Sequence, residues 1–205
     1  MTTPRWFTET DADHSTWYRD RFRELAAEGA DLEGEARFVD ALAAPSSRVL
    51  DAGCGAGRLG GALHRRGHGV VGVDADEVLV AEARDVHPGP RWLVGDLAEL
   101  DLGETFDVVV SAGNVMVFLA PGTEGRVVQR LADHVGGRGC RAVGGEGEDG
   151  ALVLGFRLDR HYALADLDAD LDRVGFAVEQ RFATWDLRPW TPSSDFAVTV
   201  ARRRS

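Results

Sequence analysis

Three glycines at alternate positions give this chain of 205 residues its most informative chemistry. Gly53, Gly55 and Gly57 stand in the run VLDAGCGAGR, after an apolar segment that ends in Asp51, and a helix-like stretch begins at Arg58. Glycine allows positive φ angles and lets a ligand approach the backbone more closely than a Cβ permits. The turn also presents its ligand to a helix N-terminus, where free N–H groups favour anionic groups. The pattern therefore predicts a cofactor-binding loop at the end of a strand.

The spacing of these glycines distinguishes a dinucleotide-binding loop from another kind of cofactor-binding loop. The dinucleotide fingerprint reads G-x-G-x-x-G, and counting from Gly53 places Arg58 where the third glycine should be. The pattern present is D-x-G-x-G-x-G, which resembles the first motif of the class I S-adenosylmethionine-dependent methyltransferases. An enzyme of the same fold that uses a dinucleotide is the alternative, and the missing third glycine counts against it.

A doubly wound α/β fold places an acidic residue at the end of the second strand, about 20 residues after the loop, to hold ribose hydroxyls. The segment GVVGVDAD puts Asp74 at that place, 17 residues beyond Gly57. The alternative role for this carboxylate is to cap the next helix, and Asp76 is better placed for that. We therefore predict that Asp74 binds the cofactor and that Asp76 caps the helix.

The resemblance implies further cofactor contacts after the third and fourth strands. Asp96, in WLVGDLAEL, would bind the adenine amino group, with the backbone of Leu97 beside the ring; a plain turn aspartate is the alternative. Asn114, in FDVVVSAGNVMVFL, would lie near the methionine half and the substrate, or would satisfy loop backbone instead. The Asn-Pro-Pro-Tyr type motif of base and glutamine methylases is absent. The predicted cofactor-binding residues are Asp51, Gly53, Cys54, Gly55, Gly57, Asp74, Ala75, Asp96, Leu97, Ala112 and Asn114.

Methyl transfer from a sulfonium is an in-line displacement with a good leaving group, so the enzyme mainly has to align donor and acceptor. A general base is needed only where the acceptor must lose a proton, and no obligatory catalytic residue is predicted. The candidates are His14, Tyr18 and Asn114. His14 could act as a general base, but an exposed or capping histidine is the alternative. Trp17 and Tyr18 could cover the sulfonium by cation–π contact or could belong to the core.

Two later segments are candidates for the acceptor side of the site. Arg157 and Arg160 stand in FRLDRHY, where their guanidinium groups could hold a substrate carboxylate. The segment TWDLRPW could line a pocket wall. The other candidates in these two segments are His161, Tyr162, Trp185, Asp186, Arg188 and Trp190.

Strand-like apolar runs alternate with amphipathic helices, as in α/β proteins. Together with the resemblance, this predicts a Rossmann-like, seven-stranded and mostly parallel sheet with helices on both faces and an antiparallel C-terminal hairpin. The predicted strands are 48–52, 69–74, 91–94, 106–112, 151–157, 177–187 and 196–201. The predicted helices are 15–28, 32–43, 59–66, 77–86, 123–135 and 164–174.

The length suits a single domain over residues 1–205. We expect a helical cap over 1–47, a cofactor-binding half over 48–135, a Gly-rich loop over 136–150 and a C-terminal half over 151–205. The Gly-rich loop is either a lid or a disordered insertion. Alternate aspartates in the last helix predict a solvated face rather than a metal site; they are Asp166, Asp168, Asp170 and Asp172.

Composition limits the partners. A net charge of −11 argues against nucleic acid or an anionic membrane, and all 23 basic residues are arginine, which excludes lysine nucleophiles. Cys54 and Cys140 form no disulfide framework, and neither a signal-peptide pattern nor a span-length apolar run occurs, so a cytoplasmic protein is expected. The scattered histidines predict no metal site.

These observations predict an S-adenosylmethionine-dependent methyltransferase with a small-molecule acceptor and S-adenosylhomocysteine as product. One alternative is a cofactor-binding protein of the same fold without catalysis of its own. Another is a protein or RNA methylase that acts with a partner. A homodimer is left open.

Overall fold

The computed structural model describes residues 3–11, 13–136 and 150–204. The strands are β1 Arg48–Ala52, β2 Gly69–Asp74, β3 Arg91–Val94, β4 Val108–Ser111, β5 Ala151–Arg157, β6 Phe176–Phe182 and β7 Phe196–Arg203. The helices are α1 Arg5–Thr8, α2 His14–Ala27, α3 Gly34–Leu42, α4 Arg58–Arg65, α5 Glu77–Val86, α6 Val115–Phe118, α7 Glu124–Asp133 and α8 Leu164–Arg173. A short 3-10 helix, η1, covers Leu97–Glu99.

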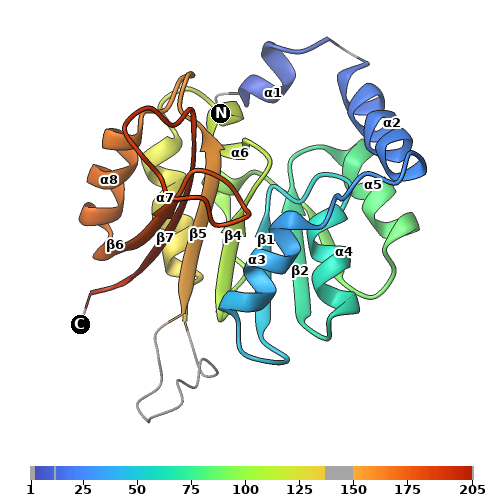
Figure 1. Ribbon diagram of the computed structural model, residues 1–205. Coiled ribbons are helices and arrows are strands. Elements are labelled where there is room, and N and C mark those ends of the chain that lie inside the picture. Colours follow the sequence, from blue (N-terminus) through green and yellow to red (C-terminus); the bar gives the residue numbers. More distant parts are fainter. Residues whose placement is uncertain (1–2, 12, 137–149, 205) are drawn as a thin grey trace.

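The described strands form one sheet in the order β3-β2-β1-β4-β5-β7-β6, and helices cover both of its faces (Figure 1). The first five strands pair in parallel, whereas β7 runs antiparallel between β5 and β6. The predicted fold class is thereby confirmed. In this strand order β1 and β4 are neighbours although β2 and β3 separate them in sequence, and parallel sheets bind ligands at such a reversal.

The central strands are apolar on both sides because helices bury both faces of the sheet. Successive side chains of a strand point to opposite faces. In β1, Val49 belongs to the core under α3 and α4, and Leu50 belongs to the core under α6, α7 and α8. The two cores hold the carboxyl ends of β1, β2 and β4 at one edge of the sheet.

Two predicted strands are longer than the structure makes them. The strand predicted over 177–187 ends at Phe182, because the chain turns there: the Ala183 N–H donates to the Arg188 carbonyl, and Leu187 has a φ of 66°. The strand predicted over 106–112 is reduced to β4, and Phe106 forms only an isolated bridge with Val135. Most of the predicted 136–150 loop lies outside the described residues.

The aspartates of α8 do not all face solvent, so that prediction is wrong for Asp170. The residue is 7% exposed, and its carboxylate accepts the Tyr162 hydroxyl at 2.5 Å and pairs with Arg173 at 2.6 Å. The reason is the packing of α8 against α7, where Gly125 leaves room for this carboxylate. Among the described residues no group of three or more metal-ligating side chains comes together. None of the described helices has the length and apolar character of a membrane span.

Candidate cofactor site

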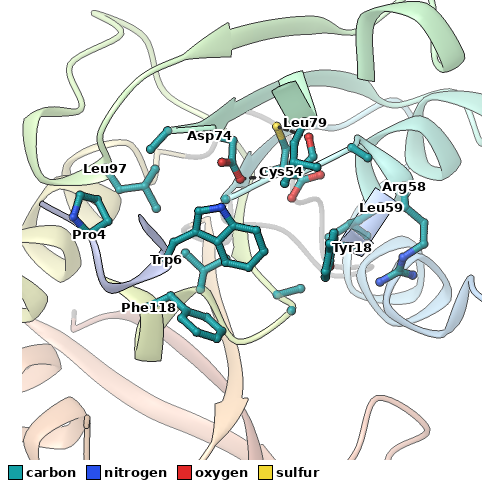
Figure 2. Close-up of a pocket in the computed structure, with 18 of the residues that line it drawn as sticks. Pro4, Trp6, Tyr18, Cys54, Arg58, Leu59, Asp74, Leu79, Leu97 and Phe118 are labelled. Carbon is teal, nitrogen blue, oxygen red and sulfur yellow. Dashed lines mark hydrogen bonds between the residues drawn. The ribbon is translucent and has the colours of Figure 1, made fainter. Parts of the chain in front are cut away.

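A pocket lies at the carboxyl ends of β1, β2 and β4, and the N-terminal segment folds over it (Figure 2). The structure brings nine of the eleven predicted cofactor-binding residues to its wall: Asp51, Gly53, Cys54, Gly55, Asp74, Ala75, Asp96, Leu97 and Ala112. The remaining two, Gly57 and Asn114, do not line it. The wall also contains residues that the sequence did not single out, including Pro4, Trp6, Phe22, Gly113 and Phe118.

The glycines of the loop serve two different purposes. Gly53, Gly55 and Gly57 all have positive φ angles, which L side chains rarely adopt. A Cβ on Gly53 would lie 2.2 Å from Val115, and one on Gly57 would lie 2.8 Å from Ala83, so packing excludes both. A Cβ on Gly55 would meet nothing closer than 3.8 Å and would project into the pocket. Gly57 therefore shapes the loop, while Gly55 leaves room beside the backbone for a ligand.

Asp74 lies at the end of β2 and is held by two backbone donors. Its Oδ2 accepts the Gly55 N–H at 2.8 Å, and its Oδ1 accepts the Asp76 N–H at 2.9 Å. Burial raises the pKa of this carboxyl, and the backbone donors oppose that shift. An ionised carboxylate has about four lone-pair sites, so two remain for hydroxyl donors in the pocket.

Asp51 is the most deeply buried carboxyl of the pocket wall, with 2% of the residue exposed. Its Oδ2 accepts the Gly60 N–H at 2.9 Å, which ties the end of β1 to α4. Desolvation raises the pKa of Asp51 from 3.8 to about 7, against the opposing effects of that hydrogen bond and of Arg58. The pKa of the neighbouring Cys54 thiol is also raised by burial, so this side chain stays neutral.

The raised pKa of Asp51 predicts a pH-dependent stability of the ligand-free protein. Because the folded-state pKa of about 7 exceeds the ordinary value of 3.8, the stability that this group contributes is fully present below pH 4. It is then lost as the pH rises toward 7. Relative to Asp51→Asn, the free energy of unfolding of the wild type should fall by about 1.4 kcal/mol per pH unit across this window. Urea unfolding at a series of pH values measures this, and parallel curves for the two proteins would contradict it.

Asp96 and Asn114 both form local backbone hydrogen bonds, with different consequences. Asp96 Oδ1 accepts the Ala98 N–H at 2.9 Å and caps η1, yet the residue still lines the pocket. Asn114 has a φ of 68°, and its Oδ1 accepts the Arg157 N–H at 2.9 Å. Asn114 thus has the role that the sequence left as the alternative, which is to form a hydrogen bond with the backbone. Its side chain joins β5 to the loop after β4.

The N-terminal segment is attached to the sheet through Asp76. This aspartate caps α5, as predicted, because its Oδ1 accepts the Val78 and Leu79 N–H groups. Its Oδ2 accepts the Trp6 indole N–H at 2.8 Å and also the Ser15 hydroxyl. One buried carboxylate therefore holds the starts of α5 and α2 together with α1. Figure 2 shows that Trp6 lies between Asp74 and Phe118.

Of the predicted aromatic and catalytic candidates near the N-terminus, only Tyr18 lines the pocket. Burial raises the pKa of Tyr18, which keeps the hydroxyl protonated at neutral pH. His14 stacks on Trp17 with ring centroids 5.2 Å apart, and Trp17 is 58% exposed. Trp17 was a candidate for covering the pocket, but the tryptophan on the pocket wall is Trp6. No sequence signal pointed to it, because α1 has only four residues.

The later acceptor-side candidates are mostly engaged elsewhere. The Arg157 guanidinium pairs with Asp159 at 2.9 Å, and the buried Tyr162 donates to Asp170. Trp185 packs on Phe38, in the core under α3, so the TWDLRPW segment does not line the pocket. The same segment holds Asp186, which pairs with Arg188, and Trp190, whose ring lies under Arg181. His161 pairs with Glu9, and Arg160 lies over the Phe118 ring.

Comparison with known proteins agrees with this geometry. A family model described as a methyltransferase domain matches residues 49–139. A TehB-like S-adenosylmethionine-dependent methyltransferase from Corynebacterium glutamicum is 40% identical, with a TM-score of 0.84 over 95% of this chain and 100% of that chain. The S-adenosylmethionine-bound CalS10 structure from Micromonospora echinaspora, 20% identical, shares the fold with a TM-score of 0.68 over 91% of this chain and 96% of that chain.

Curated sequences match more partially. The magnesium-protoporphyrin O-methyltransferase of Rhodobacter capsulatus is 35% identical over an alignment of 137 positions that covers 63% of this chain and 58% of the relative. The chain spans about half the length of the curated relatives it matches. The full-length match to the C. glutamicum structure and the glycine loop at the end of β1 lead to one conclusion. The chain belongs to the class I S-adenosylmethionine-dependent methyltransferases.

Proposed function

We propose that this protein transfers a methyl group from S-adenosylmethionine to an oxygen atom of a small-molecule acceptor. The observation that carries the proposal is the division of one pocket into two halves. Carboxylates and glycines at the ends of β1, β2 and β3 form one half, which we call the polar half. Aromatic and apolar side chains from α1, α2 and α6 form the other, which we call the acceptor half. The names of the curated relatives, which are O-methyltransferases, support oxygen as the acceptor atom.

The residues of the polar half fit the cofactor. Asp74 has lone pairs left for the two ribose hydroxyls, and Gly55 leaves its backbone open on the pocket side. Asp96 and the backbone of Leu97 would contact the adenine. The buried carboxyl of Asp51 lies on the pocket wall, where a bound amino-acid ammonium group would favour its ionised form.

When bound, the cofactor supplies an electrophilic methyl carbon, whose bond to sulfur breaks as an acceptor lone pair forms the new bond, leaving a neutral thioether. The side chains of this protein orient the acceptor and exclude water. The rings of Trp6, Tyr18 and Phe118 line the acceptor half, and Trp6 makes edge contacts with both of the others. Tyr18 is a hydrogen-bond donor rather than a base, because its pKa is raised. Tyr18 therefore does not take the proton of an acceptor hydroxyl, and that proton is released to bulk solvent.

Two measurements test this proposal. In calorimetric titration, S-adenosylmethionine and S-adenosylhomocysteine should bind with micromolar affinity, and NAD should not bind. With a labelled methyl donor, the label should enter a metabolite extract and not a protein or RNA extract. NAD binding would favour the dinucleotide alternative. Label in a macromolecule would favour a protein or RNA methylase, and binding without any transfer would indicate a non-catalytic protein.

A further inference from the structure

We propose that Arg160 binds an anionic group of the acceptor, so that the substrate is a small organic anion with an apolar body. The inference rests on the proposed function and names its substrate class. Arg160 follows β5 and is exposed, and its guanidinium carbon lies 5.8 Å from the centroid of the Phe118 ring. Phe118 lines the acceptor half of the pocket and meets Trp6 edge-on, with centroids 5.5 Å apart. The charge therefore lies at the rim of that half.

The carboxylates around this rim already have cationic partners. Glu9 pairs with Arg5 at 3.6 Å and with His161 at 3.1 Å. Asp159 pairs with Arg157 at 2.9 Å. Within the described part of the chain, Arg160 has neither a hydrogen bond nor an ion pair, although the protein carries 34 acidic residues against 23 arginines. Arg157 lowers the pKa of Asp159, and the more distant charge of Arg160 adds to this effect without pairing with the carboxylate. Its planar fork of N–H donors is thus free to take a carboxylate or phosphate from solution.

Arg160 is not itself on the pocket wall, and no cationic side chain on the described part of that wall is left to bind an anion. Among the described residues that line the pocket, the one arginine is Arg58, which pairs with Glu35 at 2.6 Å and lies over Phe22. An anion that entered beside Phe118 would meet a net negative protein and apolar walls without Arg160. The rings of Trp6, Tyr18 and Phe118, which meet edge to face, give this part of the pocket an apolar surface that suits an apolar ligand body. An apolar body and one negative charge together define the class of acceptor.

The test uses the full chain, a labelled methyl donor and a bacterial metabolite extract that has been separated on an anion-exchange column at pH 8. Acceptor activity should occur in the retained fractions, and elution by salt strength separates carboxylates from phosphates. With the active fraction as substrate, Arg160→Gln should raise KM about 10- to 100-fold with little change in kcat. Arg160→Lys should recover part of the loss, because it restores the charge without the fork.

Two controls separate this inference from the proposed function. Calorimetric binding of S-adenosylmethionine should be the same in wild type and Arg160→Gln. Arg130→Gln removes one positive charge from α7, away from the pocket wall, and should leave KM unchanged. Acceptor activity in the unretained fraction, or equal KM values for wild type and Arg160→Gln, would overturn the role of Arg160. Cofactor binding without transfer to any fraction would overturn the proposed function itself.

Discussion

Asp74→Ala is expected to weaken S-adenosylmethionine binding about 100-fold. A hydrogen bond to an ionised carboxylate contributes about 1.5–3 kcal/mol, and the proposed pair of bonds to the ribose hydroxyls is lost together. Asp74→Asn retains one carbonyl acceptor and should show an intermediate loss, about 10-fold. Calorimetric titration of the three proteins with S-adenosylmethionine and S-adenosylhomocysteine measures both effects.

The carboxylate of Asp74 also accepts the Gly55 and Asp76 N–H groups, so its removal could loosen the loop without any contact to the cofactor. Thermal unfolding of the ligand-free variants separates the two effects, because ribose contacts change only the ligand-bound stability. Asp101 offers a matched control: its Oδ1 accepts a backbone N–H from Gly103 at 3.2 Å, and it does not line the pocket. An Asp74→Ala protein that binds the cofactor as well as Asp101→Ala does would refute the ribose role.

Trp92→Ala should produce the largest loss of stability, about 3–5 kcal/mol, as expected for the removal of a buried aromatic side chain. The residue is 5% exposed, and its indole N–H donates to the His87 carbonyl at 2.9 Å. The ring fills the space that three glycines leave, since a Cβ would lie 2.3 Å from it on Gly72, 2.8 Å on Gly60 and 3.0 Å on Gly57. Its loss would therefore also remove the support beneath the glycine loop.

Urea unfolding of the ligand-free protein measures the change. Trp17→Ala is the matched control, because Trp17 is 58% exposed and its removal should change the free energy of unfolding by less than about 0.5 kcal/mol. A loss below about 1 kcal/mol for Trp92→Ala would show that the neighbouring side chains collapse into the space. It would also mean that the loop does not depend on this ring.

The central part of the site could be predicted because its signals are local. The glycine spacing around Gly55 determines the backbone of the loop, and the position of Asp74 after an apolar run places it at a strand end. Asp76 could be identified as the N-cap of α5 from its place before the helix alone. Parallel strands with crossover helices bring their carboxyl ends to one edge, so motifs far apart in sequence meet without further information.

The rest was decided by contacts between segments that no local pattern describes. Trp6 reaches the pocket because its indole N–H finds Asp76, 70 residues away. Asp170 is buried by the packing of α8 on α7, although the alternate aspartates of this helix predict a face exposed to solvent. Arg157 and Arg160 look alike in sequence, yet among the described residues Arg157 forms an ion pair with a carboxylate and Arg160 lies over the Phe118 ring. Backbone conformation depends on residues that are neighbours in sequence, whereas the pairing of charges and the closing of a pocket depend on tertiary packing. For this protein, the acceptor side of the site was therefore decided by tertiary packing.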